Sequence, residues 1–304
     1  MRGLVLAGAC PTTRITYSSL QQTFANFCRS KDLPTVPCST RTINLYITWL
    51  KKKNLSTSSI RQHIAAVKHL HHINDETTRF ENDPSHQLLK KAALKGNGAS
   101  MDKREPLTVG DLKLILAFWA SLDNYDSTML SAALCLGFSC LLRVGEFSTQ
   151  RATESPRCRL NSISFKDDIL ALHLYHSKGD RQGTGVDIAI PPIHAPHCPV
   201  SALTRFLNIR RRTSPEDSLF CHEDGKPMTG GWFREQLKLA CNRNGITKLI
   251  NGHSIRIGAA THLSGKGAPL ELIKRLGRWK SDSVERYLRP SREQSINLLK
   301  NFLQ

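Results

Sequence analysis

The hydrophobic positions in the first hundred residues repeat with the period of an α-helix. Apolar side chains recur three and four residues apart in three runs, which places them on one face of each predicted helix. These runs are Tyr17–Phe27, Ile43–Leu50 and Ile60–Leu70. Proline and serine clusters separate them, and a weaker run covers residues 85–95. We therefore predict a compact bundle of about four helices over residues 15–97.

The pattern changes after residue 97. Glycine, serine and charged residues over 98–107 predict a linker, after which Thr108 and Asp111 have the spacing of a helix-capping box. Residues 126–142 are strongly apolar and predict a buried helix. Helices are expected again after Pro199, at about 229–243, 254–265 and 269–276 and at the C-terminus.

Between the apolar helix and Pro199, apolar and polar residues alternate with the period of a β-strand. The expected strands are Leu160–Phe165, Ile169–Tyr175 and Val186–Ile190, and residues 177–183 form a hairpin turn between the last two. Residues 108–304 are therefore predicted to be a mainly α domain with one small antiparallel sheet. Residues 1–14 are expected to be a disordered or truncated N-terminus.

The charge of the chain is strongly positive, at +18 over 304 residues. Residues 1–100 contain 14 Lys and Arg against 5 Asp and Glu, so the first domain is basic in its own right, and the rest of the chain is basic as well. Two basic halves suit a long polyanion, because each neutralised phosphate releases a counterion. A generally basic or ribosome-associated protein stays open at this point. No stretch approaches the ~20 apolar residues of a membrane-spanning helix.

The nine cysteines include no C-x-x-C pair, which favours a reducing compartment. We expect a nuclear protein if the source is eukaryotic, or one of the cytoplasm or nucleoid if it is bacterial, and not a secreted one. His194, His197 and Cys198 form a single cluster of possible zinc ligands, and the sequence has no second cluster to complete a site. We therefore predict loop residues there and no metal site.

Several polar residues stand where core patterning would not place them. They are Arg143, Glu146, Lys178, His253, Arg256, Trp279 and Tyr287. Each has an ordinary structural explanation when it is taken alone. Arg143 and Glu146 suit a salt bridge, Lys178 suits a turn, His253 suits a helix cap, and the aromatic residues suit a core. These residues follow one another in a fixed order, and each lies in its own predicted element. Separate structural roles do not readily explain this order.

This order closely resembles the tyrosine recombinases, also called the phage integrase family. The resemblance rests on Leu141-Leu142-Arg143-Val144-Gly145-Glu146, Lys178 in a β-hairpin, His253-Ser254-Ile255-Arg256, and Leu276-Gly277-Arg278-Trp279 followed by Tyr287. It implies a helical, SAM-like core-binding domain and a catalytic domain that close around DNA as a C-shaped clamp. The tryptophan and the many lysines and cysteines are more similar to eukaryotic mobile-element recombinases of the Crypton or DIRS type than to bacterial Xer proteins.

The resemblance implies DNA strand cleavage and rejoining through a 3′-phosphotyrosyl link, without metal, ATP or another cofactor. Tyr287 would be the nucleophile, Lys178 the general acid for the leaving 5′-oxygen, and His253 the residue that assists proton transfer. Arg143 and Arg256 would clamp the phosphate oxygens with paired hydrogen bonds.

Trp279 would donate its indole N–H to the phosphate and pack the Tyr287 helix. Glu146 would orient Arg143. Trp279 replaces the family's more frequent histidine, and the eight residues from Trp279 to Tyr287 are one fewer than its commonest spacing.

Two other functions stay open: a domesticated DNA-binding protein without catalysis, and a type IB topoisomerase, which uses similar residues. For phosphate contact we predict a set of lysines and arginines in both domains. They are Lys51, Lys52, Lys53, Arg61, Lys68, Arg210, Arg211 and Arg212. The partner is double-stranded DNA, and the resemblance implies a homo-tetramer on DNA that assembles through the C-terminal helix.

Overall fold

The structure of the 304-residue chain is a computed structural model. It describes residues 11–95, 104–175, 184–211, 214–280, 282–288, 295–296 and 299–300. The chain divides into two compact units between Asp102 and Lys103, inside the stretch that the sequence predicts as a linker. Each unit has its own hydrophobic core.

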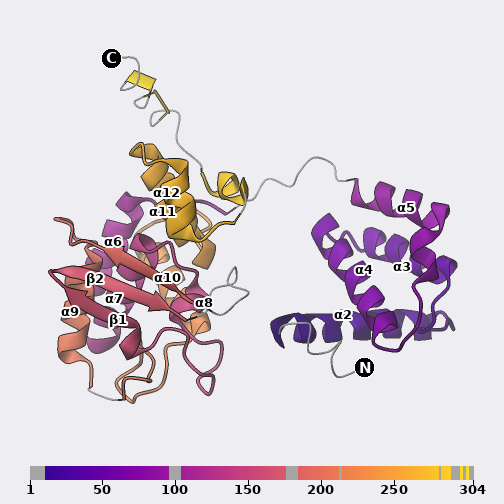
Figure 1. The fold of residues 1–304 in the computed structure, drawn as a ribbon, viewed down its shortest axis with the longest axis horizontal. Coiled ribbons are helices and arrows are strands. Elements are labelled where there is room, and N and C mark those ends of the chain that lie inside the picture. The colour runs from indigo at the N-terminus through magenta and orange to yellow at the C-terminus, as the bar shows by residue number, and fades with distance from the viewer. Residues whose placement is uncertain are drawn as a thin grey trace. The chain divides into compact units, whose positions relative to one another are not determined.

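The first unit is the helical bundle that the sequence predicts (Figure 1). Its elements are α2 (Pro11–Ser30), α3 (Thr40–Lys52), α4 (Thr57–His72), the 3-10 helix η1 (Arg79–Asn82) and α5 (Pro84–Leu94). The side chains of Ser39, Ser56 and Asp83 accept hydrogen bonds from backbone N–H groups at the starts of α3, α4 and α5. The helical-period residues of the sequence, such as Ile43 and Ile60, are fully buried and fill the core between the helices.

The N-terminal boundary differs from the expectation. Residues 11–14 belong to α2, whereas residues 1–14 were predicted to be disordered or truncated. This stretch is polar and therefore has no hydrophobic periodicity, but Pro11 suits the first position of a helix because its missing N–H would be unsatisfied there anyway. Residues 1–10 lie outside the described residues.

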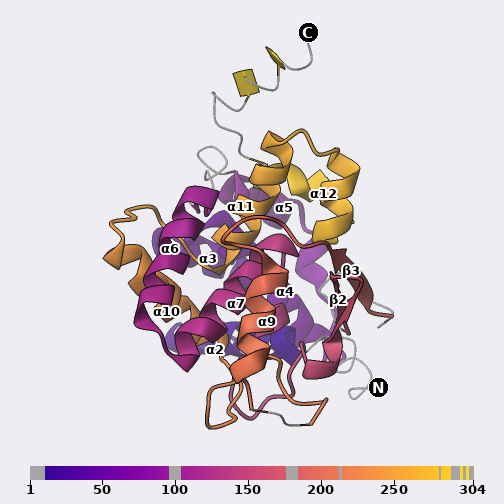
Figure 2. The same ribbon diagram turned by 90° about the vertical axis from the view of Figure 1, so that its left-hand side faces the viewer.

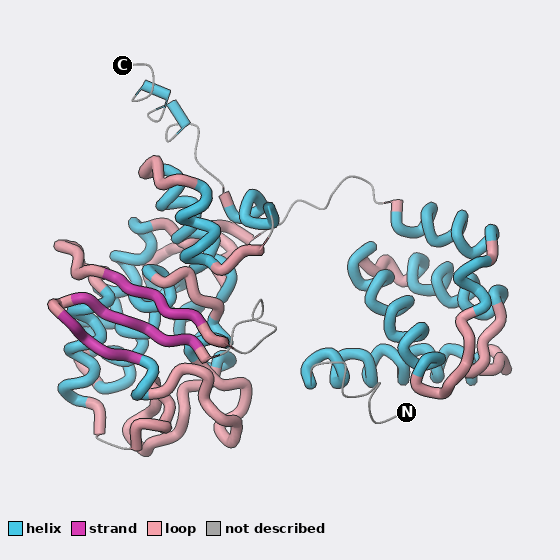
Figure 3. The backbone as a smooth tube through the Cα atoms, in the orientation of Figure 1, coloured by secondary structure: helices cyan, strands magenta, loops and turns pink. Residues whose placement is uncertain are grey.

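The second unit combines helices with a small sheet (Figures 1 and 3). Its helices are α6 (Val109–Leu122), α7 (Tyr125–Ser139), α8 (Val144–Phe147), α9 (Pro199–Ile209), α10 (Gly230–Arg243), α11 (Gly252–Gly265) and α12 (Leu270–Gly277), with the 3-10 helices η2 (Leu160–Ser162) and η3 (Asp282–Tyr287). The apolar helix α7 lies at the centre and packs against α9 (Figure 2). The capping box of α6 is confirmed, because Thr108 and Asp111 exchange side-chain and backbone hydrogen bonds.

The sheet is antiparallel in the order β1 (Ile163–Lys166), β2 (Ile169–Leu174), β3 (Val186–Ile190) (Figure 3). In its register Leu172 lies opposite both Ile163 and Ile188. Residues that face each other on neighbouring strands lie on the same side of the sheet. Leu172 and Ile188 belong to the core of the second unit, so this side of the sheet packs against that core. The fold class, mainly α with a small antiparallel sheet, is confirmed. The hairpin between β2 and β3 is present, although residues 176–183 at its turn lie outside the described residues.

Three element boundaries differ from the expectation. Residues 160–162 form η2 rather than the start of a strand. The predicted linker ends too late, because Leu107 is fully buried and its N–H donates to the Ser254 carbonyl of α11 (3.0 Å). The apolar helix α7 ends at Ser139 instead of residue 142, because Leu141 adopts a left-handed backbone conformation (φ 49°). This last difference shapes the site.

Candidate active site

A tight turn at the end of α7 positions Arg143. The Leu142 N–H donates to the Gly137 carbonyl (2.8 Å), which closes the helix, and the left-handed Leu141 redirects the chain. Arg143 then takes the N-cap position of the short helix α8. The sequence Cys140-Leu141-Leu142 is entirely buried, so the apolar run anchors the turn and leaves Arg143 at its edge.

Glu146 holds Arg143 from one turn further along. Nη1 of Arg143 donates to Oε1 of Glu146 (2.9 Å), and the Arg143 backbone N–H donates to Oε2 (2.9 Å). Glu146 is buried, while the Arg143 side chain keeps 26% of its surface exposed. The predicted pair is therefore present, and the carboxylate fixes the direction of a guanidinium that stays open to solvent.

Arg256 is fully buried on α11. Its Nη1 donates to the Leu141 carbonyl (2.5 Å), and its Nη2 donates to the Gly277 carbonyl. Burial, with repulsion from Arg143 and Arg278, lowers the pKa of Arg256 to about 9, although Glu146 opposes the shift. The group therefore remains protonated at neutral pH.

Aromatic rings cover the Arg256 guanidinium. Its Cζ lies 3.9 Å from the ring centroid of Trp279 and 5.9 Å from that of Tyr287. The two rings pack against each other, with centroids 5.1 Å apart. The hydroxyl of Thr261 donates to the Tyr287 carbonyl (2.9 Å), which ties η3 to α11. The indole thus packs against the tyrosine as predicted, and its ring also lies over the arginine.

His253 lies in the first turn of α11, three residues before Arg256. Asn251 caps this helix, and its Oδ1 accepts the His253 backbone N–H (2.9 Å). His253 is exposed, whereas Arg256 is buried. Lys178 lies outside the described residues, so its predicted position stays a prediction.

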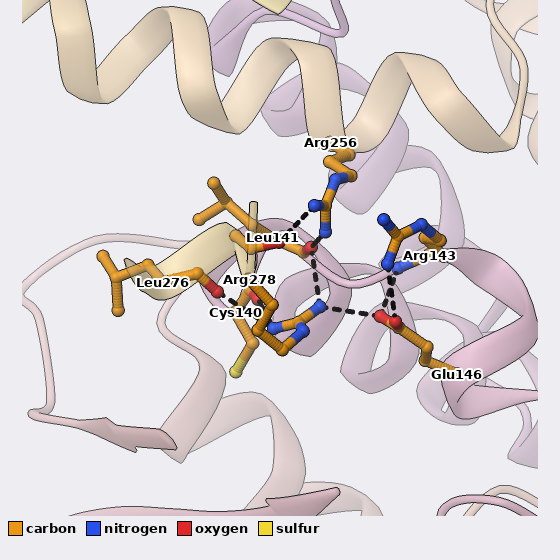
Figure 4. Close-up of polar contacts among 8 residues, drawn as sticks. Cys140, Leu141, Arg143, Glu146, Arg256, Leu276 and Arg278 are labelled. Atoms are coloured by element: carbon orange, nitrogen blue, oxygen red, sulfur yellow. Dashed lines mark hydrogen bonds and ion pairs between the residues drawn. The ribbon is translucent and has the colours of Figure 1, made fainter. Parts of the chain in front are cut away.

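Sequence reasoning assigned no role to Arg278, which is central to the site (Figure 4). Arg278 follows α12 in a left-handed conformation (φ 57°), and its Nη2 donates to Oε2 of Glu146 (2.7 Å). The buried Glu146 therefore pairs with two arginines. The sequence did point to this position, because Arg278 stands between two residues of the recognised motif. Its buried ion pair joins residues 132 positions apart, however, and is visible only in the fold.

The predicted phosphate contacts separate into two groups. Lys51, Lys52, Lys53, Arg61 and Arg211 are exposed. The prediction is wrong for Arg210, whose side chain is buried and donates to the carbonyls of Leu219 and Ser218.

Lys68 also differs from the expectation. It is partly buried and forms an ion pair with Glu81, so its cation already has a partner inside the first unit. Burial, with repulsion from Lys90, lowers the pKa of Lys68. Arg212 lies outside the described residues.

The described part of the chain has neither a membrane-spanning helix nor a metal-binding cluster. None of its helices is long and apolar enough to cross a membrane. Within the same residues, no three histidine, cysteine, aspartate or glutamate side chains gather as a metal site would require.

Comparison with known proteins places these residues in a family. A sequence profile of the phage integrase family matches residues 106–294, which is more than half of the chain. The tyrosine recombinase XerD of Oceanobacillus iheyensis is 25% identical over 238 residues, covering 76% of this chain and 70% of that protein. An integrase/recombinase XerD homologue of Selenomonas ruminantium is 25% identical over 282 residues, covering 87% and 77%.

Solved structures show the same fold at lower identity. The Tn1549 transposon integrase in complex with transposon right end DNA has a TM-score of 0.67 at 14% identity, covering 97% of this chain and 95% of that one. A lambda integrase dimer bound to a COC′ core site has a TM-score of 0.62 at 20% identity, covering 94% and 74%. The sequence match and the arrangement of Arg143, Arg256 and Tyr287 agree, and the chain belongs to the phage integrase family, the tyrosine recombinases.

Proposed function

We propose that this protein cleaves and rejoins DNA strands through a covalent 3′-phosphotyrosyl link at Tyr287, in the site-specific recombination or integration of a mobile element. One observation carries the proposal. Three segments far apart in the sequence bring together Arg143, Arg256 and the Tyr287 ring. Arg143 donates to Glu146, Arg256 donates to the Leu141 carbonyl at the turn before Arg143, and the Tyr287 ring lies beside the Arg256 guanidinium. Membership of the family supports the reaction type.

The chemistry suits this set of side chains. In the transition state of phosphodiester cleavage, negative charge grows on the non-bridging oxygens, and guanidinium groups stabilise it with directed hydrogen bonds. The phenol oxygen of Tyr287 forms a bond to phosphorus as the 5′-oxygen leaves. The phenol proton passes to a base, for which His253 is the candidate, and the 5′-oxygen gains a proton from Lys178. The new ester keeps the bond energy, so a second 5′-hydroxyl can reverse the step on another strand.

The site described here must rearrange before it binds phosphate through Arg256. Both terminal nitrogens of Arg256 donate to carbonyl groups, and the Trp279 ring lies over the guanidinium, so no surface of this residue is accessible. We infer that Trp279 moves when DNA binds, because a phosphate oxygen needs a free N–H within hydrogen-bond distance. Arg143 is partly exposed and is the arginine that first meets the phosphate.

The test is a covalent trap. The full chain is incubated with nicked duplex oligonucleotides that carry a randomised central stretch, so that a cleaved strand loses its short fragment and cannot be rejoined. Wild-type protein should form an adduct that survives denaturation, and the recovered sequences give a substrate for rate measurements. Tyr287→Phe should abolish the adduct, while Tyr175→Phe, at the half-buried residue that follows β2, should not. An adduct that persists in Tyr287→Phe would remove Tyr287 from the mechanism.

A second candidate is DNA binding without cleavage. The burial of Arg256 favours it, because an arginine whose terminal nitrogens donate to carbonyl groups stabilises the fold without any catalytic step. Sequence-selective retardation of DNA in a gel, with no adduct on any nicked duplex, would support this second function. Relaxation of supercoiled DNA by the monomer would instead indicate a topoisomerase.

We further propose that the protein forms a homo-tetramer on DNA, that its two units close around the duplex as a clamp, and that it acts in the nucleus if its host is eukaryotic. Two apolar residues near the C-terminus support the assembly, since Ile296 and Leu299 are 42% and 59% exposed. Such side chains suit a contact with a neighbouring protomer. Leu299→Asp should reduce the mass of the protein–DNA complex measured by light scattering, whereas Lys300→Asp, at an exposed neighbouring position, should not.

A further inference from the structure

The guanidinium of Arg278 reaches from the end of α12 into the segment that carries Arg143 (Figure 4). Its Nη1 donates to the carbonyls of Leu276 (2.9 Å) and Cys140 (3.2 Å), and its Nη2 donates to Glu146 Oε2 (2.7 Å) and the Leu141 carbonyl (3.2 Å). The side chain is only 5% exposed. Both terminal nitrogens are therefore engaged with protein groups.

Arg278 shares Glu146 with Arg143. Oε2 of Glu146 accepts from Arg278 Nη2 and from the Arg143 backbone N–H, while Oε1 accepts from Arg143 Nη1. A buried carboxylate is stable only when its charge and its lone pairs are satisfied. Without Arg278, the carboxylate would draw more strongly on the Arg143 guanidinium, which is the group left exposed for phosphate.

Arg278 also shares an acceptor with Arg256. Both side chains donate to the Leu141 carbonyl, at 3.2 Å from Arg278 Nη2 and 2.5 Å from Arg256 Nη1. Leu141 is a non-glycine residue in the left-handed region, a conformation that its surroundings must hold in place. Two hydrogen bonds to its carbonyl hold this turn, which sets the direction of the following Arg143.

We propose that Arg278 is a positioning residue for strand cleavage: it holds Glu146 and the Leu141 carbonyl, and through them orients Arg143 and Arg256, without contacting the phosphate. The role rests on the proposed cleavage function. Arg278 supplies the second cation for Glu146, so that Arg143 keeps hydrogen-bonding capacity for DNA. Arg278 also links the end of α12 to the turn after α7, because it donates to the carbonyls of Cys140 and Leu141.

The first test compares substitutions of two arginines, Arg278 after the end of α12 and Arg275 within that helix. Arg278→Met should slow adduct formation on the selected nicked duplex roughly 100-fold, because a small misplacement of a binding group has an effect of that order. DNA affinity should fall far less than the cleavage rate, because in this proposal Arg278 itself does not contact the phosphate. Arg278→Lys should recover part of the rate through its contact with Glu146. Arg275→Met, on the exposed side of α12, should match wild type. A wild-type rate for Arg278→Met overturns the proposal, and so does an equal loss for Arg275→Met.

The second test asks whether Arg278 acts through Glu146. In a Glu146→Gln background, Arg278→Met should slow cleavage by at most about tenfold, because the neutral amide needs no second cation. Equal losses in both backgrounds overturn the proposal. Circular dichroism shows whether Arg278→Met folds. If it does not, the double variant Glu146→Gln/Arg278→Met takes its place, because it buries no unpaired charge. Its cleavage rate is then compared directly with that of Glu146→Gln.

A third readout does not depend on activity. Arg278→Met should accelerate exchange of the Arg143 and Arg256 guanidinium protons measured by NMR, while Arg275→Met should not. Unchanged exchange overturns the positioning role. Absence of an adduct from wild-type protein would instead contradict the proposed function, so the two failures are distinguishable.

Discussion

At the scale of single residues, Gly277 determines where the Trp279 ring can lie. A Cβ added at Gly277 would overlap the indole ring, which lies over Arg256. Gly277→Ala should therefore destabilise the protein by about 1–3 kcal/mol, the usual effect of overpacking, although alanine is the better helix former. Urea unfolding followed by circular dichroism measures this change.

The control for Gly277 is Gly231→Ala in α10. A Cβ there meets nothing closer than ordinary contact distance, so the variant should be neutral or slightly more stable. If the two glycine variants unfold at the same urea concentration, the close approach of Gly277 to Trp279 is not the constraint described here.

The candidate site shows what residue patterns can and cannot predict. Arg143, Arg256 and Tyr287 were identified because each stands in a motif with a fixed local spacing. Arg278 and the Leu141 carbonyl were not, because their importance lies in hydrogen bonds that join segments more than a hundred residues apart. A pattern of residue types also carries no information on burial within a polar motif, so the covered Arg256 guanidinium and the buried Arg210 were both unexpected.

At the scale of elements, a close crossing fixes the start of the second unit. The Leu107 N–H donates to the Ser254 carbonyl, and a Cβ on Gly258 would overlap the Leu107 backbone. Because backbone atoms cannot swing aside like a side chain, Gly258→Ala should destabilise the protein by about 3 kcal/mol. Differential scanning calorimetry measures the loss. Gly110→Ala, whose added Cβ would meet the Thr108 hydroxyl oxygen only at 3.6 Å, should keep the wild-type transition.

The elements themselves were largely predictable because burial follows periodicity. The three apolar runs of the first unit became α2, α3 and α4, and the alternating segments became β2 and β3. The expectation was wrong where a tertiary contact overrides the local pattern. Leu107 looked like the end of a polar linker, and residues 160–162 continued an alternating run, but hydrogen bonds from Leu160 and Asn161 to the 215–217 loop hold them in η2.

Acid should loosen the packing of α5 in the first unit. His86 is almost fully buried, and its Nδ1 donates to Asn44 Oδ1 (2.9 Å). Within the part of the chain that the structure describes, its Nε2 has no hydrogen-bond partner. Burial, then repulsion from Lys90 and Lys68, lowers the pKa of His86, with Asp83 partly opposing.

The sign of the pH effect follows from this shift. An unfolded histidine gains a proton near pH 6.5, while folded His86 does so only at lower pH. Stability is therefore full above about pH 6.5 and is lost as the pH falls, by at most about 1.4 kcal/mol per pH unit. Hydrogen exchange of the α5 amides at pH 7.5 and 5.5 measures the loss. His86→Gln should flatten this pH dependence, whereas substitution of the exposed His72 should leave it unchanged.

At the scale of the whole molecule, the chain forms two units with separate cores, and both units carry a net positive charge. The net charge of +18 was visible in the composition, and the division into two units falls within the predicted linker. Neither the charge nor the linker predicts how the units are arranged on DNA, because that arrangement depends on contacts with the DNA itself. The exposed cations of the first unit provide the most direct test of which surface meets phosphate.

The end of α3 and its C-cap carry three exposed lysines, Lys51, Lys52 and Lys53. We expect them to displace counterions from DNA. Replacing all three with glutamine should weaken DNA binding and reduce the slope of log K against log salt by about 2.7, because each lost phosphate contact contributes about 0.9. Fluorescence anisotropy over a salt series measures the slope. Lys68→Gln provides the matched control, since Lys68 is already paired with Glu81 and should change stability without changing the slope. An unchanged slope in the triple variant would place the DNA on a different face of the first unit.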